Sequence, residues 1–165
     1  MHILIDYAVR FDIVKLLNAK NYKYIFERRR LMARLAIIEG IGEVYEKKLK
    51  AVGIKSVEGL LEACTTKKGR TELAEKSGIS EKLILKWANH ADLARIKGIG
   101  GQYSELLEAA GVDTVPELAM RRADNLYKKV VETNDAKSLV RKLPTENQIK
   151  NWIEQAANLP RVLQY

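Results

Sequence analysis

The sequence predicts an all-α protein built from two similar units, and three observations lead to this prediction. Alanine, leucine, glutamate and lysine are abundant and only three prolines occur in 165 residues, a composition typical of helices. Apolar residues make up 47% and charged residues 30% of the chain, which favours a packed core over disorder. Residues 38–61 repeat as residues 96–119, so we expect two copies of one unit.

The repeat is clearest around two Gly-Ile-Gly motifs. The segment IEGIGEVYEKKLKAVGIKSVEGLL (38–61) and the segment IKGIGGQYSELLEAAGVDTVPELA (96–119) are identical at ten of 24 positions. The ends of the units agree as well, because SEKLILKWANHA (80–91) aligns with TENQIKNWIEQA (145–156) and Trp87 falls opposite Trp152. We therefore expect one unit over 32–93, a second over 94–159 and a short tail over 160–165.

Turn and capping residues predict a string of short helices in the first unit. We expect helices near 32–38 and over about 43–52, and three more that begin at Ser56, near Lys67 and at Ser80. Gly53 and Gly78 follow the second and fourth of these helices, where a left-handed glycine commonly ends a helix.

The second unit carries matching signals. A helix is expected from residue 101, directly after the second Gly-Ile-Gly motif. Thr114 with Glu117, and Thr145 with Gln148, have the spacing of a capping box at the start of a helix. Trp87 and Trp152 are expected to pack in the cores of their units, because a large apolar side chain at helical spacing is typical of a core.

Two glycines around an apolar residue suit a sharp turn between two helices. The central residue, Ile41 or Ile99, is expected to point inward and fix the turn to the core. The helix that follows begins with N–H groups that have no partner inside the helix and carry partial positive charge. Such a turn can hold a phosphate of a nucleic acid without contacting any base, so binding would not depend on base sequence.

These motifs resemble the helix-hairpin-helix motif, in which an apolar-x-Gly-apolar-Gly turn is followed by a small residue and an apolar helix face. The tandem arrangement is similar to an uncharacterised bacterial family of paired helix-hairpin-helix domains, a domain of unknown function, over about residues 32–159. The resemblance implies two SAM-like helical bundles and DNA binding that is not sequence-specific. Ser104 matches the small-residue position of the motif, whereas Glu46 departs from it.

Charge distinguishes the two hairpins. Glu39, Glu43 and Glu46 surround the first hairpin, where carboxylates repel a phosphate, although lysines follow. We therefore predict that the second hairpin contacts phosphate, through Arg95, Lys97, Gly98, Gly100, Gly101, Gln102 and Ser104. The first hairpin is predicted to be mainly structural or a protein contact, with a weaker nucleic-acid site at Gly40, Gly42, Lys47 and Lys48. The alternative that both turns serve only folding stays open.

The formal net charge of +8 also suggests a polyanionic partner, but half of it lies in residues 1–31. That segment differs in composition from the rest, and we interpret Met32 as the natural start of the protein. A genuine basic, amphipathic N-terminal helix is the alternative interpretation. The basic clusters at 67–70, 121–122, 128–129 and 141–142 form either a binding face or ordinary solvated surface.

Two further functions are weighed against phosphate binding. Residues 72–87 fit a helix-turn-helix pattern, in which a helix from Ser80 would present side chains to a DNA groove; these are Glu81, Lys82, Lys86 and Asn89. A scaffold role is the second alternative, in which the acidic first hairpin of one chain faces the basic second hairpin of another, giving head-to-tail association.

No enzymatic activity and no cofactor are expected. His90 has no metal-binding partner at a suitable spacing and is interpreted as a polar helix residue, and Cys64 has no neighbouring base and is expected to be buried or inert. A single cysteine favours a reducing, cytoplasmic setting, and no apolar run is long enough for a membrane span.

Overall fold

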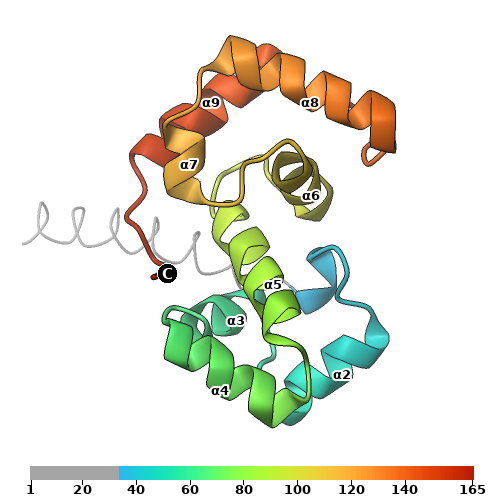
Figure 1. Cartoon of the computed structure of the whole chain (residues 1–165), viewed down its shortest axis with the longest axis vertical. Coiled ribbons are helices and arrows are strands. Elements are labelled where there is room, and N and C mark those ends of the chain that lie inside the picture. The colour runs from blue at the N-terminus through green and yellow to red at the C-terminus, as the bar shows by residue number, and fades with distance from the viewer. Residues whose placement is uncertain (1–33) are drawn as a thin grey trace, which may run out of the picture.

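The computed structural model describes residues 34–165, and this part of the chain is helical throughout, without a strand (Figure 1). The first unit contains the 3-10 helix η1 (Leu35–Ile37) and the α-helices α2 (Glu43–Ala51), α3 (Val57–Ala63), α4 (Lys67–Ser77) and α5 (Glu81–Leu93). The second unit contains α6 (Gly101–Ala109), α7 (Val115–Ala119), α8 (Ala123–Lys137) and α9 (Glu146–Ala157). The interpretation of Met32 as the natural start lies outside the described residues.

Hydroxyl side chains begin five of the eight α-helices, each by accepting the N–H of the residue three positions on; they are Ser56, Thr66, Ser80, Thr114 and Thr145. The capping box at Thr145 is complete, because Gln148 returns a bond to the Thr145 N–H. At Thr114 the box is one-sided, since the Glu117 carboxylate accepts from the Asp113 N–H at 2.9 Å instead.

Glycines end two helices as the sequence predicted, with φ of +91° at Gly53 and +63° at Gly78. The helix expected near 32–38 is shorter in the described residues, where only the 3-10 turn η1 forms. The turn ends at Ile38, whose extended backbone leads the chain into the first Gly-Ile-Gly motif.

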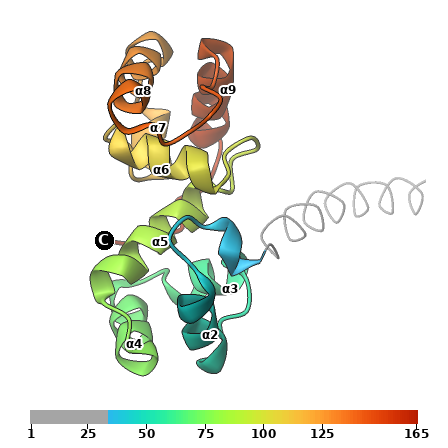
Figure 2. The same ribbon diagram turned by 90° about the vertical axis from the view of Figure 1, so that its right-hand side faces the viewer.

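The buried apolar side chains form two clusters, one in each unit. The first contains Trp87 and the second Trp152, which are 1% and 2% exposed. Helix α5 connects the two units and carries core residues of both, since Trp87 belongs to the first cluster and Leu93 to the second. The two views show α5 lying between the first unit and the helices α6 to α9 (Figures 1 and 2).

The two units anchor their Gly-Ile-Gly motifs in the same way. Gly40 and Gly98 have φ of +88° and +101° and lie against the indole nitrogens of Trp87 and Trp152. A Cβ at Gly98 would come within 2.8 Å of the Trp152 Nε1 atom, and one at Gly40 within 3.3 Å of that of Trp87. Glycine is therefore required twice over, by its backbone angle and by the nearby ring.

A tyrosine completes each of these contacts. The ring of Tyr45 packs against Trp87 with 5.0 Å between centroids, and Tyr103 packs against Trp152 with 5.2 Å. The glycine, tyrosine and tryptophan that recur in the sequence are thus one packing unit used twice.

The tail after α9 returns to the first unit. Leu163 is 1% exposed and belongs to the first apolar cluster, far along the chain from its neighbours. The Gln164 N–H donates to the Thr65 carbonyl at 2.9 Å, and the Tyr165 hydroxyl bonds to the Asn89 Oδ1 atom at 2.7 Å. The tail therefore ties the second unit to the first.

Among the described residues, no helix combines the length and apolar character that crossing a membrane requires.

We predict that Gly98→Ala lowers the free energy of unfolding by about 2–3 kcal/mol, because alanine is strained at positive φ and its methyl group collides with Trp152. Gly100→Ala is the matched control, since Gly100 has φ of −109° and no atom within 4 Å of an added Cβ. We expect the control to cost about 0.5–1 kcal/mol, as for an alanine at an N-cap. Urea unfolding followed by circular dichroism measures both, and equal losses would contradict the packing role of Gly98.

Candidate nucleic-acid interface

The second bend, residues 96–101, connects α5 to α6 and is open to solvent at three positions. Lys97, Gly98 and Gly100 are exposed, whereas Ile99 is 4% exposed and points into the second core. Ile41 is buried in the same way in the first unit, so the predicted inward position of both isoleucines is confirmed. The bend therefore has an anchored centre and an accessible backbone.

A glutamine from α9 fixes the backbone of the second bend. The Lys97 N–H donates to the Gln155 Oε1 atom at 2.8 Å, and the Gln155 Nε2 group donates to the Lys97 carbonyl at 3.2 Å. The amide of Lys97 is thus used within the protein, while its side chain stays exposed. No local sequence pattern indicates this clasp, because 58 residues separate the two partners.

Helix α6 starts in a way that sets it apart. Its N-cap is Gly100, which offers no side chain to the first N–H groups, and its first turn contains no acidic residue. Among the α-helices of residues 34–165, α6 alone combines an uncapped N-terminus with an acid-free first turn. The N–H groups of residues 101–103 therefore have neither a capping side chain nor an acidic residue of their own first turn beside them.

Two of the residues predicted to contact nucleic acid are engaged inside the protein. The Arg95 guanidinium is 10% exposed and donates to the Asp92 carboxylate at 2.7 Å and to the Pro160 carbonyl at 3.0 Å. Ser104 is fully buried, so its hydroxyl lies out of reach of a nucleic acid. Arg95 holds the tail and Ser104 provides a small side chain in the core; Gln102 remains exposed.

Gly101 has a packing role that the sequence did not reveal. A Cβ at this position would lie 2.1 Å from the Ile37 carbonyl oxygen and 3.2 Å from the Glu39 nitrogen. The start of α6 therefore lies directly against the backbone that leads into the first Gly-Ile-Gly motif. Figure 2 shows α6 above η1 in this arrangement. The exposed residue Glu39 is consequently a near neighbour of the second bend.

The first bend, residues 38–43, differs in charge. Gly40 and Gly42 are exposed, but the first turn of α2 contains Glu43 and Glu46. These carboxylates pair with lysines of the same helix, Glu43 with Lys47 at 2.7 Å and Glu46 with Lys50 at 2.9 Å. The carboxylates lie at the positive end of α2 and offset the charge of the two lysines that they pair with. Lys48, by contrast, is exposed.

Three of the four candidate groove residues of α5 make contacts within the protein. Glu81 accepts from the Thr71 hydroxyl at 3.0 Å, Lys86 pairs with Glu108 at 3.2 Å, and Asn89 bonds to the tail. Lys82 is the one candidate groove residue that is exposed without an ion pair or hydrogen bond among the described residues. The pattern in residues 72–87 is therefore explained by the α4–α5 connection at Gly78.

The basic cluster at 67–70 is also partly internal. Arg70 is 4% exposed and donates to the Cys64 carbonyl at 2.9 Å.

Cys64 is fully buried, as the sequence predicted. Burial raises the pKa of its thiol to about 12, against the smaller opposing effect of the Arg70 charge. The thiol is therefore protonated and unreactive at neutral pH.

A polar cluster joins the two units where α5 meets α6. His90 is 1% exposed, and its Nε2 atom lies 2.9 Å from the Glu108 carboxylate, which also binds Lys86. Glu105 lies 4.0 Å from the same lysine. Burial lowers the pKa of His90, against the opposing hydrogen bond from Glu108. His90 is thus a buried residue between the units, where the sequence had indicated a polar residue of a helix.

We predict that the protein loses stability as the pH falls below about 6.5, the ordinary pKa of histidine. Because the pKa of His90 is lowered on folding, the unfolded chain binds the proton first, and acid favours unfolding. Stability that depends on His90 is complete above this pH and is lost below it. Urea unfolding at several pH values measures the effect, and a His90→Gln variant should have a weaker dependence; an unchanged dependence would exclude His90 as its source.

A family model described as "Domain of unknown function (DUF4332)" matches residues 39–159, which is most of the chain. The match includes the second bend, the first bend except Ile38, and all eight α-helices. No curated protein and no solved structure matches the chain.

Proposed function

The chain belongs to the DUF4332 family, whose function is unknown, and we propose that it binds nucleic acid, in the first place duplex DNA, through the phosphate backbone and without base specificity. One observation carries the proposal: the N-terminus of α6 is uncapped and acid-free, and it follows an exposed, lysine-bearing bend. Backbone N–H groups at a helix N-terminus bind phosphate oxygens well, and a nearby lysine adds a long-range attraction.

We infer that each unit is a helix-hairpin-helix within a SAM-like bundle, with the bends as the hairpins. The repeated packing of a left-handed glycine on a tryptophan supports this inference, because it fixes the same backbone path in both units. The phosphate-binding groups are then the backbone of Gly98, Gly100 and Gly101, with the exposed side chains of Lys97 and Gln102.

The first bend is proposed as the weaker contact. Its backbone at Gly40 and Gly42 is open, and Lys47 and Lys48 are exposed, but two carboxylates stand in the first turn of α2. The role proposed here is binding without catalysis, and the proposed setting is the cytoplasm, where a lone cysteine stays reduced.

We predict that Lys97→Glu weakens binding of a random duplex about tenfold, because the substitution places a negative charge at the phosphate site. The slope of log affinity against log salt should fall by about one. Lys76→Glu, an exposed lysine in the last turn of α4, makes the same charge change elsewhere and should alter affinity less than about twofold. Fluorescence anisotropy of a labelled duplex at low and moderate salt measures the affinity and the salt slope of the parent protein and of both variants.

The neighbouring carboxylate offers a test in the opposite direction. Glu39→Gln should strengthen binding about twofold to threefold, since it removes a like charge next to the second bend. Equal binding by the parent protein and by the Lys97 and Glu39 variants would rule out the second bend as the phosphate site.

A second candidate function is self-association, and one feature favours it. Ile37 and Val44 are 44% and 67% exposed, on either side of the acidic first bend. Exposed apolar side chains beside carboxylates suit a basic surface of another copy, which gives head-to-tail association. Light scattering over a range of concentrations, with and without a Val44→Glu substitution, detects this association in the absence of DNA.

A further inference from the structure

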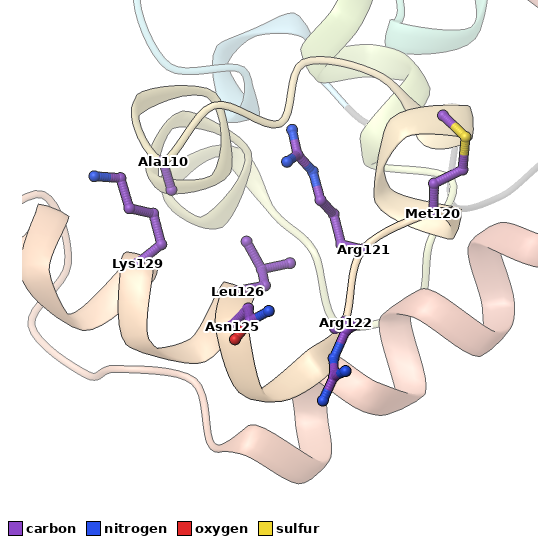
Figure 3. A pocket seen from close by; sticks show the side chains of 7 residues that line it. All are labelled: Ala110, Met120, Arg121, Arg122, Asn125, Leu126 and Lys129. Atoms are coloured by element: carbon purple, nitrogen blue, oxygen red, sulfur yellow. The ribbon is translucent and has the colours of Figure 1, made fainter.

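A hollow with a volume of about 290 Å³ lies at the end of α6 that is opposite the second bend (Figure 3). Ala110, the C-cap residue of α6, forms part of its wall, and the segment from Met120 to Lys129 forms the rest. The second bend precedes the N-terminus of the same helix. The hollow is therefore separate from the proposed nucleic-acid site.

Three basic residues and no acidic residue line the hollow. Arg121 is held in place by one bond, from its Nη2 group to the Gly111 carbonyl at 2.7 Å, which leaves most of its five N–H donors for a ligand. Lys129 is paired only loosely with Glu132, at 3.7 Å on the surface. Arg122 points away from Arg121 and makes two bonds to Asp124, which offsets its charge, so Arg121 is the main anion-binding group of the hollow.

Apolar side chains form the floor. Leu126 is 4% exposed and lies between Arg121 and Lys129 in the close view (Figure 3), and Ala110 lies beside Lys129. Met120 is 78% exposed, the highest value among the large apolar residues that the structure describes as exposed. A methionine at the edge of a site adapts to flat ligands through its flexible thioether.

Asn125 adds a side-chain amide to this hollow, with donors and an acceptor that can recognise polar edges of a flat ring. The combination of a partly fixed guanidinium, an apolar floor, an amide and a distant ammonium group fits a ligand with an anionic head and a flat body that carries hydrogen-bonding groups. A volume near 290 Å³ is at the small end of ligand sites.

We propose that this hollow binds a nucleoside monophosphate. The phosphate lies on Arg121, whose planar fork can hold two phosphate oxygens at once, and the base rests on Leu126 and Ala110 with Asn125 and Lys129 at its edges. Neither the family description nor the proposed nucleic-acid site includes these residues.

The test is a titration of the full chain with adenosine monophosphate, followed by amide NMR spectra. Signals of residues 110–111 and 120–129 should shift, with a dissociation constant in the millimolar range or below. Adenosine lacks the phosphate and inorganic phosphate lacks the nucleoside, so each should bind with an affinity lower by about tenfold or more. Equal binding of adenosine would overturn the role of Arg121, and equal binding of inorganic phosphate would overturn the role of the apolar floor.

Variants identify the residues. Arg121→Ala should weaken binding about tenfold and Lys129→Ala about threefold, whereas Lys150→Ala, an exposed lysine of α9, should leave it unchanged. Because Arg121 also bonds Gly111, Arg121→Lys is the second variant: it keeps the charge but loses the two-point contact, and should weaken binding by several fold. Binding that is unchanged in the Arg121→Lys and Lys129→Ala variants would overturn the proposal.

A random duplex is the final arm of the experiment. It should shift signals of residues 97–102 and leave those of residues 120–129 in place. Shifts at 120–129 with the duplex, in the absence of any with adenosine monophosphate, would assign the hollow to nucleic acid and overturn a separate nucleotide site.

Discussion

The contact between a left-handed glycine and a tryptophan ring determines the shape of both units. Gly98 brings the backbone against the indole of Trp152, and its positive φ is one that residues with a side chain rarely adopt. Gly40 does the same at Trp87. The next isoleucine is buried, and the helix that follows begins at once. The direction and exposure of each bend therefore depend on one close approach of backbone to ring.

The two units differ at one position of the repeat, and this difference affects both of them. Gln155 and His90 occupy equivalent places, three residues after the tryptophan of their unit. Gln155 turns to its own unit and clasps the backbone of Lys97, whereas His90 turns to the other unit and binds Glu108. The second bend is thereby fixed by a side chain, and the first unit gains a contact that joins the two units.

Basic and acidic residues are distributed unevenly along α6. The helix begins with free N–H groups beside Lys97, carries Glu105 and Glu108 toward α5, and ends at the hollow near Arg121. The acidic residues on its middle are paired with Lys86 and His90 between the units. The acidic side chains of the middle of α6 are therefore paired between the units, and the basic residues Lys97 and Arg121 lie near its two ends.

The sequence by itself determined the all-helical fold, most helix starts and the two buried tryptophans, because caps, glycines and apolar spacing act over a few residues. It also located the bends, since the repeat placed Gly-Ile-Gly before a helix twice. Only the tertiary structure decided which residues of the second bend are accessible. Arg95 is held by Pro160, Gly101 lies against Ile37, and Gln155 holds Lys97, and each partner is about 60 residues away in the chain. Local sequence patterns carry no information on such distant contacts, because these form only when segments far apart in the chain pack together.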